Sequence, residues 1–233
     1  MAKRPSSPNL LLAALPAADR KRLLGQREPV ELLAGSVLIE PGEKVQHVLF
    51  PIDGFISLIA PISRTEQLEV GLVGTEGALD ATVALGVHVS ALRAVVQGAG
   101  SAWRIDVATF RREVARSPAL QRVANRYLYV LLSQFALTAA CTRFHYLDAR
   151  LARWLLMTRD RAHSDDFLVT HQFLAHMLGV RRVGVTRAAS ALQQRELIRY
   201  HRGRVSIRDP RGLEDTACSC YAAAKGMYAS VLG

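Results

Sequence analysis

Residues 169–192 read VTHQFLAHMLGVRRVGVTRAASAL, and this stretch decides the fold of the region around it. Thr170 suits a helix N-cap, because its hydroxyl accepts a hydrogen bond from a free amide of the first turn. Apolar residues then recur at helical spacing until Gly179, a residue suited to the left-handed conformation that ends many helices. A second helix is expected to begin near Arg181. Two short helices joined by a glycine-containing turn predict a helix-turn-helix.

The second predicted helix has two unlike faces at about 100° per residue. The face expected to be buried consists of Val185, Ala188, Ala189 and Leu192. The opposite face contains no acid and consists of Val183, Thr186, Arg187, Ser190 and Gln194, with Arg182 at its edge. This composition suits a DNA major groove, where arginine bonds guanine and a valine methyl contacts thymine. An ordinary helical hairpin with a solvated basic face is the alternative.

A predicted β-hairpin follows the second helix. Residues 197–200 and 205–208 are short β-prone runs on either side of His201-Arg202-Gly203-Arg204. The glycine and the short spacing are typical of a hairpin turn. A hairpin in this position is a wing, and its tip carries Arg202 and Arg204.

With the wing included, the C-terminal third of the chain resembles the Crp/Fnr family of bacterial transcription regulators. The family pattern T-x-x-x-[LI]-A-x-x-[LV]-G-x-x-R-x-x-V-x-R is matched by Thr170, Leu174, Ala175, Leu178, Gly179, Arg182, Val185 and Arg187. The resemblance extends to residues 148–152 and, more loosely, to the rest of the chain. It implies a winged helix-turn-helix that binds double-stranded DNA as a homodimer, with RNA polymerase as a further partner. The expected DNA-binding residues are Thr170, His171, Arg181, Arg182, Val183, Thr186, Arg187, Ser190, Arg202 and Arg204.

The net charge of +10 is distributed unevenly along the chain. Residues 148–212 contain 13 Arg and no Lys against 6 acids, so this segment carries +7 of the total. Positive charge concentrated on the candidate DNA-binding segment is the pattern expected of phosphate binding. A generally basic surface that aids solubility would not single out this segment.

Length and composition are typical of a globular protein with two modest domains. The chain has 233 residues, half of them hydrophobic. No apolar run approaches the ~20 residues of a membrane span, and the first residues lack the apolar core of a signal peptide. The three cysteines, Cys141, Cys218 and Cys220, are too few and too unevenly placed for a disulfide scaffold. We therefore expect a cytoplasmic protein without membrane contact.

An α+β fold in three parts is expected along the chain. Residues 1–8 look disordered, and residues 9–24 read as one or two short helices around Pro16. From Val30 to about Val107, glycines separate short β-prone runs, of which residues 37–39, 48–50, 56–59, 68–70 and 94–96 are the clearest. Such runs suggest a sandwich or barrel, and the resemblance implies a β-roll of the cyclic-nucleotide-binding type. The expected parts are helices and β-roll at 1–118, a dimerisation helix and hinge at 119–147, and a winged helix-turn-helix with a tail at 148–233.

The dimerisation helix is predicted over residues 119–145, after Ser117-Pro118, because proline is favoured in a first helical turn. The segment contains no Pro or Gly and only three charged residues. A helix this apolar around its circumference is buried on more than one side. We predict that one side packs on the β-roll and the other on a second subunit. A buried helix in a monomer is the alternative.

The sequence argues against cyclic AMP as the effector of the β-roll. Family members that bind cyclic nucleotides present Gly-Glu-Leu, whereas this chain has Gly77-Ala78-Leu79-Asp80, and Ser90 stands where their phosphate-binding Arg is expected. The Thr-Ser pair of their dimer helix aligns with Phe135-Ala136. Each lost polar partner would cost about 1–3 kcal/mol. An effector of unknown identity remains possible, with Glu76, Asp80, Ser90 and Arg93 as pocket candidates, although loop charges are more often simply solvated.

No cofactor, metal or catalytic site is expected from the spacing of the remaining residues. An iron–sulfur member of the family needs four cysteines, most of them near the N-terminus, and none precedes Cys141. Cys218 and Cys220 are too close for a common zinc pair and have no second half, so two thiols in a C-terminal helix are expected. No acid/base or nucleophile set marks an enzyme. The alternatives to a DNA-binding regulator are a nucleotide-responsive module acting on a partner protein and a small-molecule enzyme.

Overall fold

The computed structural model describes residues 9–63 and 66–232, so the disorder expected for residues 1–8 lies outside the described part. The chain divides into two compact units. The first contains the described residues of Met1–Leu58, Gly71–Ser133 and Tyr228–Gly233, and the second contains those of Ile59–Val70 and Gln134–Met227. The boundary between the units falls inside one long helix. The expected domain limits at 118 and 147 stay a prediction.

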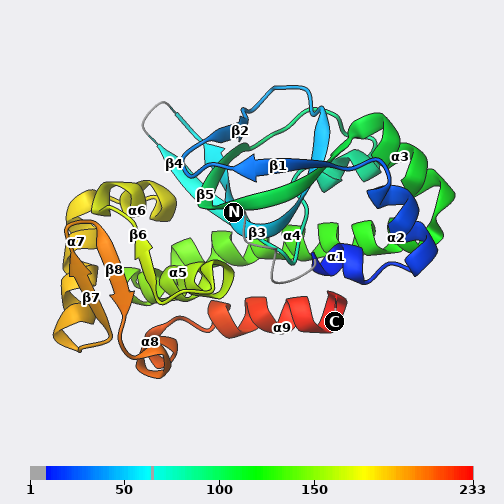
Figure 1. Ribbon diagram of the computed structural model, residues 1–233. Helices are drawn as coiled ribbons and strands as arrows, with labels where there is room; N and C mark the ends of the chain where they lie inside the picture. Colours follow the sequence, from blue (N-terminus) through cyan, green and yellow to red (C-terminus); the bar gives the residue numbers. More distant parts are fainter. Residues whose placement is uncertain (1–8, 64–65, 233) are drawn as a thin grey trace. The chain divides into compact units, whose positions relative to one another are not determined.

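The first unit contains most of an antiparallel sheet, of which residues 59–61 and 67–70 belong to the second unit. Its strands are β1 (Glu28–Leu32), β2 (Val37–Ile39), β3 (His47–Pro61), β4 (Gln67–Val73) and β5 (Arg93–Asp106), and the 3-10 helix η1 (Ala81–Leu85) follows β4 (Figure 1). The strand order is β1-β5-β3-β4, with β2 also paired to β5. The strand-rich texture predicted for this region and the α+β fold class are confirmed.

One long strand replaces two short predicted ones. The runs 48–50 and 56–59 both belong to β3, which continues through Gly54. Gly54 has a φ of +72°, and a Cβ at this position would lie 2.3 Å from the carbonyl oxygen of Gly98 on β5. Only glycine allows the two backbones to approach this closely in that conformation. Gly54, which in the sequence suggested the end of a strand, therefore allows β3 to continue alongside β5.

Two helices precede the strands of this sheet, and a third follows the last strand. α1 (Leu10–Ala13) and α2 (Ala17–Leu24) lie on either side of Pro16, as predicted, whereas α3 (Val107–Arg116) was not predicted. The Asp106 carboxylate caps α3 by accepting a hydrogen bond from the Thr109 amide at 2.9 Å. An acid directly before a helical run was the signal for this helix.

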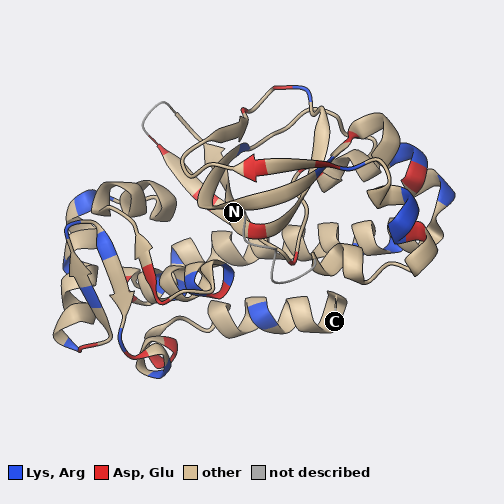
Figure 2. Ribbon diagram, viewed as in Figure 1, with Lys and Arg blue, Asp and Glu red and all other residues tan. Residues whose placement is uncertain are grey.

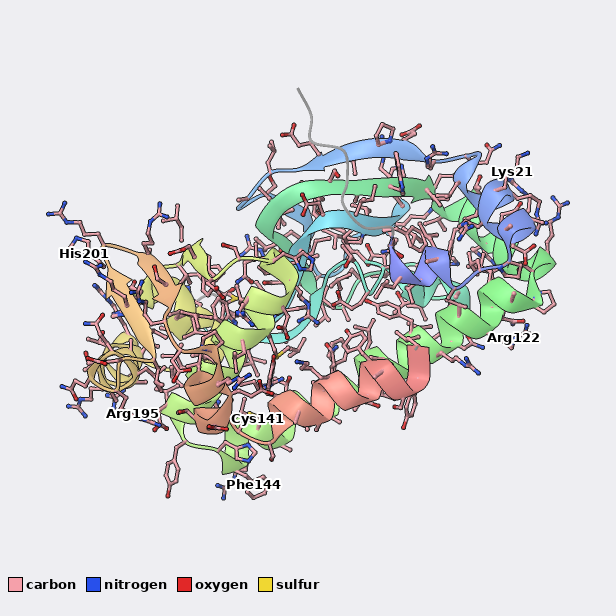
Figure 3. All side chains as sticks on the ribbon, turned by 60° about the horizontal axis from the view of Figure 1, so that its bottom comes forward. Lys21, Arg122, Cys141, Phe144, Arg195 and His201 are labelled. Carbon is pink, nitrogen blue, oxygen red and sulfur yellow. The ribbon has the colours of Figure 1, made fainter. Side chains whose placement is uncertain are left out.

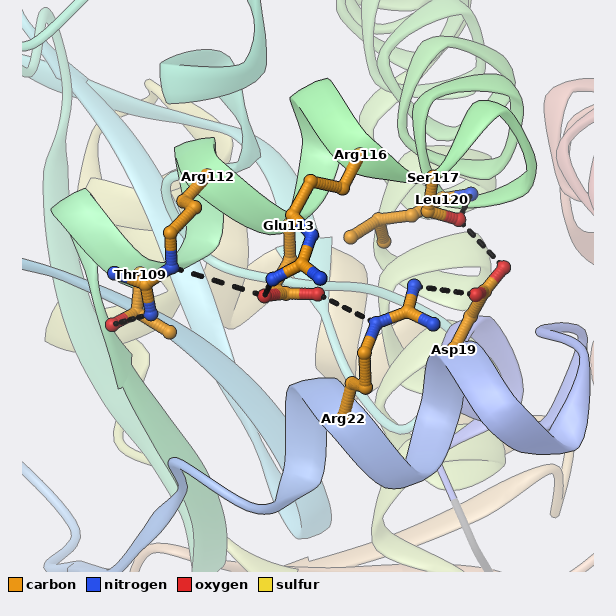
Figure 4. Close-up of polar contacts among 8 residues, drawn as sticks. All are labelled: Asp19, Arg22, Thr109, Arg112, Glu113, Arg116, Ser117 and Leu120. Carbon is orange, nitrogen blue, oxygen red and sulfur yellow. Dashed lines mark hydrogen bonds and ion pairs between the residues drawn. The ribbon is translucent and has the colours of Figure 1, made fainter.

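A polar network joins α2, α3 and the start of the next helix (Figure 4). Glu113 is buried on α3 and accepts a hydrogen bond from Arg22 Nε at 3.1 Å. Arg22 also pairs with Asp19 at 2.6 Å, and the Ser117 hydroxyl donates to Asp19 at 2.7 Å. The hydrogen bonds from Ser117 and Arg22 lower the pKa of Asp19. Arg22 thus neutralises a carboxylate that would otherwise be costly to bury.

The long helix α4 (Pro118–Phe144) confirms the predicted helix, with both ends one residue earlier. The Ser117 hydroxyl accepts a hydrogen bond from the Leu120 amide and so caps its first turn. Tyr127 is fully buried beneath Gly77, where a Cβ would come within 2.4 Å of the phenol oxygen. The outer side of α4 carries an exposed apolar stripe, defined here as Tyr129, Leu132, Ala136, Ala139 and Ala140.

The second unit holds the helix-turn-helix. Its elements are the last part of α4, α5 (Leu147–Ala162), β6 (Asp166–Leu168), α6 (His171–Leu178), α7 (Arg182–Gln194), β7 (Ile198–His201), β8 (Arg204–Ile207), α8 (Pro210–Thr216) and α9 (Cys220–Leu232) (Figure 1). The predicted hairpin is confirmed as β7–β8, and β6 adds an unpredicted third strand in the order β6-β8-β7. Within residues 9–63 and 66–232, no helix is long and apolar enough to cross a membrane.

Candidate nucleic-acid interface

The turn between α6 and α7 is built by local capping contacts. The Thr170 hydroxyl accepts a hydrogen bond from the Phe173 amide at 3.1 Å, which starts α6. Gly179 adopts a φ of +61°, and its amide donates to the carbonyls of Ala175 and His176, which ends α6. Arg181 is the N-cap position of α7. The predicted helix-turn-helix is confirmed in each of these positions.

The two faces of α7 differ as its sequence predicts. Val185, Ala188, Ala189 and Leu192 are buried. The opposite face, called here the exposed face of α7, consists of Arg182, Val183, Thr186, Arg187, Ser190 and Gln194. Val183 is 52% exposed, so its methyl groups are available to a partner. This face carries no carboxylate, because α7 contains neither Asp nor Glu.

The wing ends in a tight turn with two positive φ angles. Arg202 has a φ of +46° and Gly203 a φ of +79°, and these two residues alone separate the paired residues His201 and Arg204. This combination is typical of a type I′ hairpin turn. The Val169 amide donates to the Gly203 carbonyl at 2.7 Å, which fixes the turn beside the start of α6. The turn presents Arg202 and Arg204, both exposed, to solvent.

His171 connects α6, α7 and the wing. Its ring stacks on Tyr200 with centroids 4.2 Å apart, and its Nδ1 lies 3.0 Å from the Thr186 hydroxyl. The Thr186 hydroxyl also donates to the Arg182 carbonyl at 3.1 Å. Partial burial, together with the positive charge of Arg182, lowers the pKa of His171. The lowered pKa favours the neutral form of the His171 ring, which has only one N–H to donate.

The arginines of this region carry unneutralised charge. None of the ion pairs within residues 9–63 and 66–232 includes Arg181, Arg182, Arg187, Arg202 or Arg204. Figure 2 shows Arg along α7 and the β7–β8 hairpin, and acids on the neighbouring β6 and α8. A surface with one sign of charge concentrates a polyanion near it. The predicted DNA-binding residues are all exposed except His171, which is half-buried.

Two contacts that the sequence did not predict hold the helix-turn-helix on its support. Arg150 on α5 is buried and donates a hydrogen bond to the Leu178 carbonyl at 2.5 Å. Leu178 is the last residue of α6, where carbonyls have no partner within the helix. Burial lowers the pKa of Arg150. Trp154 Nε1 donates to the buried Glu69 carboxylate at 2.9 Å, and its ring meets the Phe173 ring edge-on at 6.3 Å. Both residues position α6 without facing solvent.

Three of the four effector-pocket candidates make local contacts in the first unit. The Ser90 hydroxyl donates to the Leu92 carbonyl at 2.9 Å, and Arg93 pairs with Glu40 at 3.1 Å. Glu76 accepts a hydrogen bond from the Gly74 amide at 3.3 Å. Burial raises the pKa of Asp80 to about 6, so this carboxylate is the unusual group among them. These contacts do not join the four side chains into one site.

The second unit also brings together two pairs of residues that lie far apart in the sequence. Cys141 and His145, near the end of α4, meet Cys218 and Cys220, which precede and begin α9. Only Cys220 lies in the C-terminal helix, so the expectation of two thiols in that helix is wrong for Cys218. The overlooked signal was a Cys-x-x-x-His pair, since residues four apart share one side of a helix.

The chain is similar to known proteins in part of its sequence and in most of its fold. Residues 149–216 match the Crp-like helix-turn-helix domain. No curated protein matches the chain. A putative transcriptional regulator of the Crp/Fnr family from Eubacterium rectale has 18% sequence identity and a TM-score of 0.70, with 90% of this chain and 98% of that chain covered.

Two further solved structures are similar over slightly less of the chain. The c-di-GMP responsive global regulator CLP from Xanthomonas campestris has 17% identity and a TM-score of 0.69, with 82% of this chain and 99% of that chain covered. A transcriptional regulator of the Crp/Fnr family from Thermus thermophilus has 21% identity and a TM-score of 0.68, with the same shares covered. At these identities the likeness establishes the fold.

Proposed function

We propose that this chain, which has a Crp-like helix-turn-helix domain and the fold of the Crp/Fnr regulators, is a sequence-specific DNA-binding transcription regulator. The observation that carries the proposal is the acid-free, exposed face of α7 beside a wing with two unpaired arginines. A major groove admits a helix with this face, and the flanking arginines meet phosphates. The proposal implies a cytoplasmic location and RNA polymerase as a partner.

The regulator binds an inverted repeat as a homodimer through α4. The exposed apolar stripe on α4 supports this arrangement, because Leu132 is 65% and Tyr129 59% exposed on a helix whose other side is already buried. Monomeric proteins rarely leave such a continuous apolar surface in water. A twofold axis along α4 presents two copies of α7 about 34 Å apart, one turn of DNA.

The candidate residues divide into two roles. Arg187, Val183 and Ser190 read base edges from the exposed face of α7, and Arg181 lies at the start of the same helix. Thr170, His171, Arg182, Arg202 and Arg204 contact phosphates and orient the domain. Thr186 contributes mainly its methyl group, because its hydroxyl is already bonded within the protein.

Selection of bound sequences from random double-stranded DNA with the purified protein tests the proposal. We expect enrichment of an inverted repeat whose half-sites lie one helical turn apart, and an affinity that falls steeply with salt. A protein that enriches no sequence and shows no salt-dependent affinity for DNA contradicts the proposal. That result would favour a regulatory module acting on a partner protein.

Replacing Arg204 by alanine should weaken binding similarly on the selected site and on random DNA. The reason is that a phosphate contact carries no sequence information, and its loss makes the salt slope less steep by roughly 1. Fluorescence anisotropy titrations over a range of salt concentrations measure both quantities. Arg211→Ala is the matched control, because Arg211 is exposed on α8 outside the wing. An unchanged slope for Arg204→Ala would place the wing away from the DNA backbone.

Cyclic AMP is expected not to bind the first unit. Ser90 stands where a phosphate-binding arginine is expected, and its hydroxyl is bonded to the Leu92 carbonyl. The neighbouring arginine, Arg93, is paired with Glu40. Isothermal titration calorimetry should detect no heat of specific binding, and micromolar or tighter affinity would overturn this interpretation of Ser90 and of Phe135-Ala136. An effector of a different chemical class remains part of the proposal.

A further inference from the structure

Four metal-ligating side chains converge in the second unit at the end of α4. The sulfur atoms of Cys141, Cys218 and Cys220 and a ring nitrogen of His145 all lie within 4.8 Å of one another. Cys141 Sγ is 3.5 Å from Cys218 Sγ, and Cys220 Sγ is 3.6 Å from His145 Nδ1. Figure 3 labels Cys141 on α4 and Phe144 at the end of that helix.

The backbone of two segments brings these four groups together. His145 directly follows α4, and its amide donates to the Cys141 carbonyl at 3.2 Å, which places it one turn beyond Cys141. The Cys218 amide donates to the Ala149 carbonyl at 3.4 Å, which holds the link between α8 and α9 against the start of α5. The Tyr221 amide donates to the Cys218 carbonyl at 3.0 Å, which turns Cys220 back toward the same point.

The spacing of the four atoms fits a single tetrahedral ion. With a Zn–S bond of about 2.3 Å, two sulfurs of a tetrahedral site lie about 3.8 Å apart. The 3.5 Å between the sulfurs of Cys141 and Cys218 is close to this value. With a Zn–N bond of about 2.0–2.1 Å, a sulfur and a nitrogen of the same site lie about 3.6 Å apart, which the 3.6 Å from Cys220 Sγ to His145 Nδ1 matches. The distance between the two sulfurs is far above the ~2.05 Å of a disulfide bond, and all three cysteines are free thiols. An iron–sulfur cluster would have to spread the ligands around several metal ions, which a span of 4.8 Å does not allow.

Burial and charge favour a cation at this point. Cys141, Cys218 and Cys220 are 1%, 7% and 4% exposed, so water does not compete for the three sulfurs. A bound cation displaces the thiol protons, because the thiolate is the form that binds metals. Three thiolates, one neutral imidazole and a divalent cation carry one net negative charge, which Arg153 partly offsets.

A small apolar cluster of thiols is the competing explanation. Leu137 and Ala149 pack against the three sulfurs, and buried cysteines commonly behave as small hydrophobic residues. That explanation does not require an imidazole, yet His145 directs a ring nitrogen at Cys220 rather than at solvent. Three thiols and one imidazole are also the complete donor set of a structural zinc site.

We propose that Cys141, His145, Cys218 and Cys220 form a Cys3His site for one thiophilic divalent cation, with Zn2+ as the ion. Thiolate and imidazole ligands select zinc over the harder cations Mg2+ and Ca2+. Binding releases the thiol protons to solvent and leaves the oxidation state of sulfur unchanged. The ion joins the end of α4 to the link that begins α9. This site does not depend on the proposed DNA binding.

Metal content and cobalt spectroscopy of the full chain test the site. Protein purified under reducing conditions without chelator should contain one equivalent of zinc, measured by inductively coupled plasma mass spectrometry. After zinc is removed with a chelator, Co2+ should bind with the visible bands of a tetrahedral ion and sulfur-to-cobalt charge-transfer bands. Absence of stoichiometric zinc together with an octahedral cobalt spectrum overturns the site. Iron–sulfur absorption after anaerobic purification overturns the choice of a single ion.

Variants assign the ligands. Cys220→Ser and His145→Gln should each weaken zinc binding by more than about 100-fold. Mutating a residue that only hydrogen-bonds a metal ligand costs up to about 100-fold, and these two variants remove a ligand itself. Cys220→Ser should also lose about one third of the sulfur-to-cobalt intensity, whereas His145→Gln should keep it, because only one of them removes a thiolate. Ser219→Ala, between the two cysteines, and His88→Gln, in the first unit, are the matched controls and should bind zinc normally.

The outcomes separate a metal site from a structural cluster. Circular dichroism of each variant checks that it is folded, and the cobalt spectrum of the unaltered chain stands even where a variant does not fold. Unchanged zinc affinity in a folded Cys220→Ser or His145→Gln protein overturns the assignment. So does an equal loss of zinc in the two controls. All measurements are made without DNA, so a negative result leaves the proposed function intact.

Discussion

Leu132→Asp is expected to convert the protein into a monomer and to weaken its binding to an inverted repeat by about 10²–10⁴-fold, the range in which a second linked site raises affinity. Leu132 is the most exposed large side chain of the apolar stripe on α4, at 65%. In the proposed dimer it is covered by the same stripe of the partner subunit, and a carboxylate placed there must be desolvated without a cation. Binding to DNA then relies on one half-site.

Sedimentation at micromolar concentration and anisotropy titrations on the inverted repeat measure the two effects. Leu85→Asp is the matched control, because Leu85 is 62% exposed in the first unit but lies outside α4. It should leave both the dimer and the affinity unchanged. Sedimentation of the unaltered protein as a monomer, with DNA absent, contradicts the dimer and removes the reason to expect an inverted repeat.

Arg187→Ala is expected to cost about 1–3 kcal/mol on the selected site and to relax the preference at one base pair. Arg187 lies near the middle of the exposed face of α7 and forms no ion pair within the described residues. Its guanidinium is therefore free to bond O6 and N7 of a guanine with two parallel hydrogen bonds. Competition titrations with each base at that position measure the loss. Gln194→Ala, at the far end of the same face, is the control.

Val183→Glu should shift the preference opposite this position toward cytosine. The valine offers only methyl groups, which suit thymine or tolerate several bases, whereas a glutamate accepts a hydrogen bond from the cytosine amino group. The same titrations report this change. If Arg187→Ala instead weakens binding to every sequence equally, Arg187 contacts a phosphate and the assumed orientation of α7 in the groove is wrong.

Local signals in the sequence predicted the helix-turn-helix well. The caps at Thr170 and Gly179 and the buried side of α7 depend on residues within one or two turns of each other, so their pattern is visible without the fold. β6 was not predicted, because a strand of three residues has too few positions to show a period. β3 was predicted as two strands, because the close approach of Gly54 to Gly98 joins residues far apart in the chain.

In the candidate site, too, local features were predictable and contacts between distant residues were not. The exposed face of α7 follows from helical periodicity alone. The bond between His171 and Thr186 spans 15 residues and the contact between Cys141 and Cys218 spans 77, and spacing along the chain does not reveal either. Ser90 was named for its position where a phosphate-binding arginine is expected, and Arg93 for its charge nearby, yet Ser90 bonds to the Leu92 carbonyl and Arg93 pairs with Glu40. Chemical type predicts a site only where the fold brings the groups together.

The hydrogen bond between Trp154 and Glu69 affects when Glu69 can be buried during translation. Glu69 leaves the ribosome 85 residues before the indole that donates to it. At about 5–20 residues per second, the acid is synthesised roughly 4–17 s before its donor. A carboxylate is costly to bury before the indole that bonds it is present. Residues 67–70 of β4 are therefore expected to remain hydrated during most of translation and to be buried only after α5 has emerged.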